Sequence, residues 1–252
     1  MATGPKGRVK ESRYDYPSTI PKPLSFGEGL GRGPLRRTAN LFQRHGNQSL
    51  NPDPKRLVVS VTGASGALYA VQFLRQATHH FDEIYLILSE NAAAVYQQET
   101  GMALSRPYTP DKYPGGMLGA GQIIYVDHKN YFSPPASGSF RHDGMVIIPC
   151  SMGTIGRIAG GISNDLTTRA ADVCLKERRK LILVARETPL NLIQLRNMVA
   201  VTEAGATVLP AVPSFYTRPQ TVEEVVDTVV ARVLQNLGVA QSLQPQWMIG
   251  EE

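Results

Sequence analysis

Residues 56–67 read Arg-Leu-Val-Val-Ser-Val-Thr-Gly-Ala-Ser-Gly-Ala and decide the fold class of this chain of 252 residues. Apolar and β-branched residues run into a glycine turn and a helical pattern follows at once, which predicts a strand, a tight loop and a helix start. The N–H groups of such a helix start carry partial positive charge and suit a phosphate. Gly63 and Gly66 let the backbone turn sharply, and Ser65 adds a hydroxyl. The stretch lacks the full G-x-G-x-x-G pattern, so it indicates a mononucleotide phosphate loop, with an ordinary strand–helix turn as the alternative.

Strand-like and helix-like runs alternate along the rest of the chain. The expected strands are Leu57–Thr62, Glu83–Ser89, Met145–Cys150, Leu181–Ala185 and Ala206–Leu209. The expected helices are Ala67–Thr78, Asn91–Thr100, Asp165–Arg178, Leu190–Ala204 and Val222–Leu237. This alternation predicts an α/β fold in which helices cover both faces of a parallel sheet, in a single domain of residues 55–252. Residues 105–143 show little regular pattern and are expected to form a binding loop or lid. We expect His128 and His142, which fall in that segment, in solvent or at a ligand.

Charge is unevenly distributed. The formal charge is +5, but residues 1–50 hold nine Lys or Arg and three Asp or Glu, leaving 17 basic and 18 acidic residues after position 50. The main domain therefore lacks the basic excess that nucleic-acid binding requires. No run approaches about 18 consecutive apolar residues, so the sequence predicts no membrane span.

Residues 1–54 are rich in Pro, Gly, Arg, Asn and Ser, which predicts a mostly disordered basic N-terminal extension. A subunit-contact arm and an organelle transit peptide are the alternatives. Cys150 and Cys174 do not form a disulfide framework, which favours a reducing compartment. The expected location is the cytoplasm, with a mitochondrion or plastid as the alternative.

In an open α/β sheet, ligands bind beyond the carboxyl ends of the strands, so residues that follow strands are the candidates for chemistry. Such positions are held by Gly63–Gly66, Ser89, Cys150–Thr154, Arg186 and Glu187. Ser89 is alternatively a plain helix N-cap. Arg186 and Glu187 are either a surface ion pair or a functional acid beside a phosphate-binding base.

Two further groups of residues are suited to anion binding. Arg169 and Lys176 are seven residues apart on one helix, so they project from one face about 10 Å apart, with Asp172 between them. Near the C-terminus, Tyr216 lies in an aromatic turn and Arg232 borders an apolar helix stripe. The alternatives are a solvated helix face for the first group and an arginine that only reaches toward water for the second.

Seven short motifs occur in order along the chain: Thr62-Gly-Ala-Ser-Gly66, Pro135-Ala-Ser-Gly-Ser139, Cys150-Ser-Met-Gly-Thr154, Thr168-Arg-Ala-Ala-Asp-Val173, Leu175-Lys-Glu-Arg-Arg179, Arg186-Glu-Thr-Pro189 and Phe215-Tyr-Thr-Arg-Pro-Gln220. Taken together, these motifs resemble those of the UbiX-type flavin prenyltransferases, and the resemblance runs from about Arg56 to Trp247. The resemblance implies a Rossmann-like (flavodoxin-like) fold that binds reduced FMN. It implies transfer of a dimethylallyl group from dimethylallyl monophosphate to N5 and C6 of FMN without a metal. The prenylated FMN would serve a UbiD-type decarboxylase, and the protein would be a homo-oligomer, in this family a dodecamer.

The resemblance also implies residue roles by position. It implies FMN binding by Gly63, Ala64, Ser65, Ser89, Ser151, Met152, Thr154 and Arg186. It implies binding of the substrate phosphate by Arg169, Lys176, Tyr216 and Arg232. Glu187 would manage protons on the leaving phosphate with Ser65 close by, while Glu99 and Tyr131 match further active-site positions.

Two other functions stay open from the sequence. The first is an FMN-dependent cysteine decarboxylase, which shares a Pro-Ala-Ser motif. Against it, the motif here continues Gly138-Ser139, and no histidine occupies the helix after Ser89. The second is a non-catalytic flavin-carrying subunit of a decarboxylase, which would not require Arg169, Lys176, Glu187 and Arg232 together.

Overall fold

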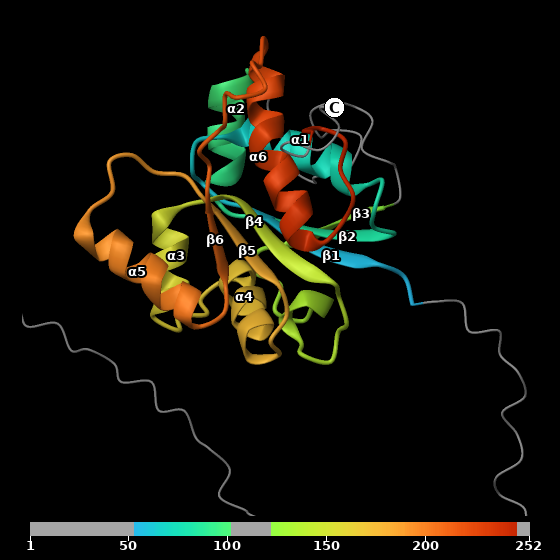
Figure 1. Cartoon of the computed structure of the whole chain (residues 1–252). Coiled ribbons are helices and arrows are strands. Elements are labelled where there is room, and N and C mark those ends of the chain that lie inside the picture. Colours follow the sequence, from blue (N-terminus) through green and yellow to red (C-terminus); the bar gives the residue numbers. More distant parts are fainter. Residues whose placement is uncertain (1–52, 102–121, 246–252) are drawn as a thin grey trace, which may run out of the picture. The chain divides into compact units, whose positions relative to one another are not determined.

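The computed structural model describes residues 53–101 and 122–245. The predictions made for residues 1–52 and for the first part of the 105–143 segment lie outside the described residues. Six parallel strands form one sheet in the order β3-β2-β1-β4-β5-β6 (Figure 1). The strands are β1 (Arg56–Val61), β2 (Glu83–Leu88), β3 (Ile123–Asp127), β4 (Gly144–Cys150), β5 (Leu181–Ala185) and β6 (Thr207–Pro210). This is the Rossmann order, so the prediction of a parallel Rossmann-like sheet is confirmed.

Helices cover both faces of the sheet, as expected (Figure 1). On one face, α1 (Ala67–Ala77) and α6 (Val222–Leu237) share a hydrophobic cluster with the strands, and α2 (Ala92–Thr100) lies beside α1. On the other face, α3 (Met152–Ala159) and α4 (Leu166–Lys176) contribute to a second cluster. The remaining helix, α5 (Leu192–Glu203), packs on α3 and β6.

The core lies in the central strands and in the helix residues that face them. All seven residues of β4 are buried, as expected for a central parallel strand with both faces covered. Phe73 and Leu74 of α1 are fully buried against the sheet. Burial of each such side chain contributes about 1.5–3 kcal/mol relative to exposure.

Side chains and glycine set the helix ends that the sequence suggested. Asp165 and Thr168 form a capping box at the start of α4, and Thr221 accepts a hydrogen bond from the Glu224 N–H at the start of α6. Gly238 ends α6 in the left-handed conformation, with φ at 82°. These caps fix where the helices enter and leave the sheet edges.

One expectation was wrong in part. The segment 105–143 was expected to be an irregular loop, but it contains β3, which pairs in parallel with β2 from Ile84↔Ile123 to Leu88↔Asp127. It also contains a short 3-10 helix, Pro134–Ala136. As an edge strand, β3 is only partly buried, and the Gly- and Pro-rich sequence around it hid its short apolar run.

Candidate active site

A polar cavity of about 330 Å³ lies at the carboxyl edge of the sheet, where β1 and β4 are neighbours and the chain connections diverge. This is the position at which open α/β sheets bind ligands. The cavity brings together Gly63, Ser89, Ser151 and Thr154, four of the residues selected from the sequence. It is lined by Thr62, Gly63, Ser89, Glu90, Asn91, His128, Lys129, Ser151, Thr154, Arg157, Asn164 and Asp165.

Two glycines shape the loop after β1. A Cβ atom added to Gly63 would lie 2.7 Å from the Asn91 Cβ, so only glycine lets the loop approach the start of α2 this closely. Gly66 has a φ of 115°, a conformation that side chains disfavour. Ala64 is buried and Ser65 is partly buried between them. The turn predicted after β1 is thus present.

Glu99 caps the start of α1. Its carboxylate accepts hydrogen bonds from the N–H groups of Gly66, at 3.0 Å, and Ala67, at 2.7 Å. The backbone N–H groups that the sequence predicted to bind a phosphate therefore donate hydrogen bonds to a carboxylate in the single chain. A negative side chain at this position is stabilised by the partial positive charge of the helix N-terminus. It also brings Glu99 to the turn that carries Ser65.

A buried hydroxyl connects β1 with the loop after β4. Thr62 Oγ1 donates to the Pro149 carbonyl at 2.8 Å and accepts from the Ser151 N–H at 2.9 Å. Ser151 in turn caps α3, and its hydroxyl lies 3.0 Å from the Thr154 hydroxyl. Met152, the first residue of α3, is buried. This chain of hydrogen bonds holds the Ser151 and Thr154 hydroxyls at the cavity wall.

An ion pair joins α3 to α4 at the same cavity. Arg157 contacts the Asp165 carboxylate and donates to Asn164 Oδ1 at 2.8 Å. Burial opposes the ionised form of Asp165. Hydrogen bonds from the Thr168 N–H and from Arg157 outweigh that effect and hold the pKa of Asp165 below its usual value. Arg157 was not predicted as a site residue, because nothing local in the sequence marks an ion pair between two helices. Asp165 was recognisable only as a helix start.

His128, expected in solvent or at a ligand, is buried at the end of β3 and lines the cavity. Its carbonyl accepts the Leu166 N–H at 2.8 Å, which ties β3 to the start of α4. Neither ring nitrogen has a hydrogen-bond partner among the described residues, and Nδ1 lies 3.7 Å from Asp127 Oδ1. Buried polar atoms in proteins are normally paired, so a polar group held in the cavity would suit this ring.

Arg186 and Glu187 follow β5 at the same edge of the sheet, and both are exposed. The Arg186 N–H donates to the Cys150 carbonyl at 3.2 Å, which places the pair beside the Ser151 loop. Burial raises the pKa of Tyr69, and the positive charge of Arg186 partly offsets this rise. The Arg186 guanidinium therefore acts electrostatically on Tyr69 of α1.

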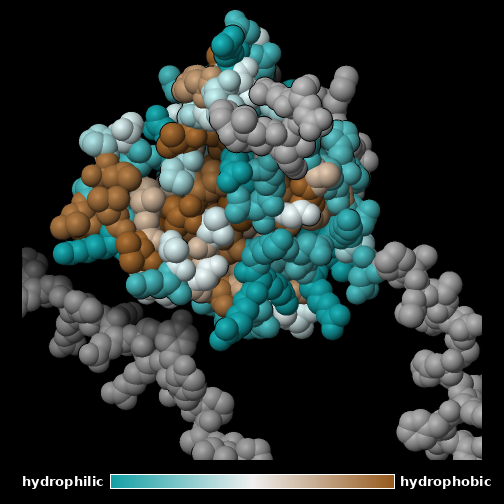
Figure 2. Space-filling model, viewed as in Figure 1, coloured by the Kyte–Doolittle hydropathy of each residue, from teal (hydrophilic) through white to brown (hydrophobic). Residues whose placement is uncertain are grey.

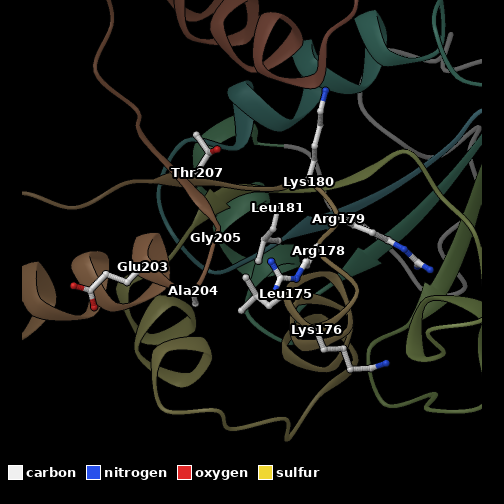
Figure 3. A pocket seen from close by; sticks show the side chains of 10 residues that line it. All are labelled: Leu175, Lys176, Arg178, Arg179, Lys180, Leu181, Glu203, Ala204, Gly205 and Thr207. Atoms are coloured by element: carbon white, nitrogen blue, oxygen red, sulfur yellow. The ribbon is translucent and has the colours of Figure 1, made fainter.

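Arg169 and Lys176 lie together beside the Pro135–Ser139 turn. Arg169 Nε donates to the Ala136 carbonyl at 3.1 Å and its guanidinium pairs with Asp172. Lys176 pairs with Glu177. A Cβ atom added to Gly138 would lie 2.7 Å from Lys176 Nζ. Figure 3 shows Lys176 and Arg179 extending from the end of α4, away from Glu203. Lys176 lines a cavity at the amino ends of β5 and β6, on the opposite edge of the sheet from Gly63.

Tyr216 and Arg232 share a third cavity, of about 450 Å³, between the segment after β6 and α6. The Arg232 guanidinium donates to Gln235 Oε1 at 2.7 Å. Tyr131 is exposed near the end of β3, and its hydroxyl lies 3.5 Å from the Ser163 carbonyl. In the described part of the single chain, Lys176 therefore lines one cavity while Tyr216 and Arg232 line another, although the resemblance assigned all three to the substrate phosphate.

Among residues 53–101 and 122–245, no group of three or more His, Cys, Asp or Glu side chains is placed to hold a metal ion. None of the helices in these ranges is long and apolar enough to cross a membrane.

A Rossmann-ordered sheet with a polar cavity at its switch point defines a nucleotide-binding α/β protein. A sequence model of the Flavoprotein family matches residues 45–234. The flavin prenyltransferase UbiX of Pseudomonas aeruginosa is 44% identical over 197 residues, which cover 77% of this chain and 94% of that protein. The chain therefore belongs to the UbiX-type flavin prenyltransferase family.

Two solved structures agree with this membership. AnUbiX (PadA1), described in complex with FMN and dimethylallyl pyrophosphate, is 39% identical with a TM-score of 0.69. The match covers 77% of this chain and 97% of AnUbiX. A dodecameric FMN-dependent UbiX-like decarboxylase from Escherichia coli O157:H7 is 38% identical with a TM-score of 0.68, over 77% of this chain and 99% of that protein.

Proposed function

We propose that this chain is a flavin prenyltransferase that transfers a dimethylallyl group from dimethylallyl monophosphate to N5 and C6 of reduced FMN. The main support for the proposal is the arrangement of residues at the carboxyl edge of the sheet. There a hydroxyl-lined cavity lies beside an exposed Arg186–Glu187 pair, in a chain of the prenyltransferase family. This membership favours prenyl transfer over cysteine decarboxylation.

The cavity residues fit a flavin nucleotide. The hydroxyls of Ser89, Ser151 and Thr154 provide hydrogen-bond donors, and Lys129 and Arg157 provide positive charge close to them. The unpaired ring of His128 is a further polar group that a bound molecule would satisfy. We assign FMN binding to Ser89, Ser151 and Thr154 together with the residues that frame them, Gly63, Ala64, Ser65, Met152 and Arg186.

Reduced FMN supplies the nucleophilic N5 and C6 atoms for the new bonds. The protein must neutralise the leaving phosphate while the carbon–oxygen bond breaks, because negative charge builds on that phosphate. We assign this electrostatic role to Arg169, Lys176 and Arg232, with Tyr216 as a hydrogen-bond donor. Glu187 would give a proton to the leaving phosphate, which improves it as a leaving group.

Glu99 and Tyr131 complete the assignment around the flavin. The Glu99 carboxylate is held by backbone N–H groups beside Ser65, so its position is fixed before a ligand binds. Tyr131 presents an exposed aromatic ring near the cavity residue Lys129. Such a ring would help to keep water away from an allylic cation, which water would convert to an alcohol.

We also propose a homo-oligomer, as in the dodecameric relative, in which neighbouring subunits complete the site. The separation of Lys176 from the cavity of Tyr216 and Arg232 supports this arrangement. The product would serve a UbiD-type decarboxylase. Residues 1–54 would be an extension to a catalytic domain of residues 55–252. Cytoplasmic location, with mitochondrion or plastid as the alternative, stays a prediction from the sequence.

The test is anaerobic incubation of the full chain with reduced FMN and dimethylallyl monophosphate, followed by mass analysis of the released flavin. The expected result is FMN that has gained one C5H8 unit, with no gain when the prenyl donor is left out. Parallel reactions with the diphosphate donor establish which donor is preferred. Bound but unmodified FMN with both donors would contradict the proposal and favour the non-catalytic flavin carrier.

A further inference from the structure

The cavity at the carboxyl edge of the sheet has polar walls. Twelve described residues line its volume of about 330 Å³, and none of them has an apolar side chain. Exposed apolar surface lies elsewhere on the chain, for example over α5 (Figure 2). Sites that hold a flat apolar ring have mostly apolar walls. This cavity is therefore suited to the polar end of FMN, the ribityl phosphate, rather than to its three-ring system.

Arg157 is a firmly held cation on the cavity wall. Its Nε donates to the Gly153 carbonyl at 3.4 Å and its Nη2 donates to Thr154 Oγ1 at 3.2 Å. Its Nη1 donates to Asn164 Oδ1 at 2.8 Å and to the Asp165 carboxylate. These four bonds leave one of the five guanidinium N–H donors, on Nη2, without a partner in the described part of the chain. The side chain is 30% exposed, so this donor is fixed in place and accessible to a ligand.

Arg157 also determines how the neighbouring hydroxyls can bond. Thr154 Oγ1 accepts from Arg157, and Ser151 Oγ accepts from the Thr154 N–H at 3.3 Å. The two hydroxyl oxygens lie 3.0 Å apart and share one hydrogen bond. That bond uses one of their two protons, so the other proton is left to donate to a bound group. The wall formed by these three residues therefore offers donors, which suits an acceptor that carries negative charge.

The other charged residues of the cavity do not replace Arg157. Lys129 and Glu90 are both exposed, so their opposite charges are screened by solvent. Asp165 has both carboxylate oxygens occupied, one by Arg157 and one by the Thr168 N–H at 2.8 Å. Arg157 is thus the cation whose position in the cavity is set before a ligand binds.

We propose that Arg157 is a specificity-determining residue that recognises the phosphate of FMN and selects FMN over riboflavin. The remaining Nη2 N–H and the remaining proton of the Ser151–Thr154 pair would donate to phosphate oxygens. The inference rests on the proposed binding of FMN and identifies a residue that distinguishes the phosphorylated flavin. The alternative is an ion pair that only joins α3 to α4. Such a pair would contribute to folding but would not distinguish two flavins that differ only in the phosphate.

The test compares the affinities for FMN and riboflavin. Arg157→Met alone would leave the Asp165 carboxylate unpaired, and that charge would itself repel a phosphate. The informative comparison is therefore between Asp165→Asn and the double variant Arg157→Met with Asp165→Asn, which differ only at position 157. Asparagine keeps a side-chain oxygen that can cap α4. Arg75→Met is the matched control, because Arg75 is exposed on α1, donates to Gln72 at 2.9 Å and does not line the cavity.

Flavin fluorescence titration measures both affinities. Removing Arg157 from the Asp165→Asn protein should lower FMN affinity by about tenfold or more, as expected for a charge-assisted hydrogen bond, and riboflavin affinity by less than about twofold. Arg75→Met should match wild type for both flavins. Equal losses for the two flavins, an unchanged FMN affinity, or the same loss in Arg75→Met would overturn the inference.

A measurement on the wild-type chain covers the case in which circular dichroism shows the double variant to be unfolded. Phenylglyoxal modifies accessible arginines, and peptide mapping follows its reaction with Arg157. Saturating FMN should protect Arg157, whereas saturating riboflavin should not. Equal protection by both flavins, or protection by neither, would overturn the inference. Mass analysis of flavin prenylated by the same wild-type sample tests the proposed function separately, because FMN can be selected over riboflavin with or without prenyl transfer.

Discussion

Thr62 provides the most direct test of how the flavin cavity is held together. Its buried hydroxyl joins the end of β1 to the loop after β4 through the Pro149 carbonyl and the Ser151 N–H. Replacement by Val keeps the size and branching of the side chain and removes both bonds. Thr62→Ser is the matched control, because it keeps the hydroxyl and loses a methyl group.

The expected loss of free energy follows from the hydrogen bonds that the Pro149 carbonyl and the Ser151 N–H keep in the variant. The Pro149 carbonyl keeps a second bond, since the Thr62 N–H donates to it at 3.3 Å. The Ser151 N–H loses the one partner that the described structure gives it. Leaving a buried donor unpaired costs about 1–3 kcal/mol, and Ser151 is only partly buried, so we expect about 1–2 kcal/mol.

This cost will be divided between two measurable quantities. If the Ser151 loop stays in place without FMN, the free energy of unfolding falls by about 1–2 kcal/mol. If the loop relaxes instead, the loss moves to binding, and FMN affinity falls by about 5- to 30-fold, because about 1.4 kcal/mol corresponds to a factor of ten. Urea unfolding at matched protein concentration and flavin fluorescence titration measure the two parts. A Thr62→Val protein that matches Thr62→Ser in both assays would refute the reasoning.

Three further changes test the proposed roles one at a time. Glu187→Gln should leave FMN affinity unchanged and slow prenyl transfer by about 100-fold or more, which is the usual contribution of a general acid. If mass analysis shows product forming at the full rate, Glu187 has no part in the mechanism. Lys176→Ala should raise the KM for the prenyl phosphate by about 10- to 100-fold, because it removes a charge-assisted hydrogen bond, and should leave FMN titrations unchanged. An unchanged KM would contradict the assignment of Lys176 to the substrate phosphate. Asp165→Asn should flatten the acid dependence of stability. Because the pKa of Asp165 in the folded state lies below the ordinary 3.8, its ionised carboxylate stabilises the wild type above about pH 4, and this stability is lost as the pH falls through the folded-state pKa. If the urea midpoints of variant and wild type change in the same way with pH over this range, the expectation is contradicted.

The sequence was informative where local pattern and topology act together. Short apolar runs correctly predicted β1, β2, β4, β5 and β6. The signal is clearest for β1, β4 and β5, because a strand buried on both faces needs a continuous apolar segment. Their carboxyl ends in a parallel sheet meet at one edge, which is why Gly63, Ser89 and Ser151 share a cavity. The edge strand β3 needs less apolar sequence, and it was missed.

Contacts between distant elements were not predictable in this way. Arg157 pairs with Asp165 across the junction of α3 and α4, and Glu99 of α2 reaches back to the start of α1. Neither contact leaves a periodic or spacing signal, since each depends on how two helices lie in space. The exposure of α5, in which Val201 is the one buried residue, was equally hidden, because its apolar sequence is that of a helix expected to be buried.

The separation of the phosphate-binding cations has a physical rationale in the proposed oligomer. Three like charges gathered in one cavity of an isolated chain would repel one another and oppose folding. In the single chain each has a local partner instead: Arg169 bonds Asp172, Lys176 bonds Glu177 and Arg232 bonds Gln235. Each subunit can therefore fold with its cations stabilised. In the proposed oligomer, assembly would bring cations from neighbouring subunits together, where the substrate phosphate would offset their repulsion. It follows that dilution to a concentration at which the proposed oligomer dissociates should weaken binding of the prenyl phosphate far more than binding of FMN. Equal losses for both ligands would show that the phosphate site does not depend on assembly.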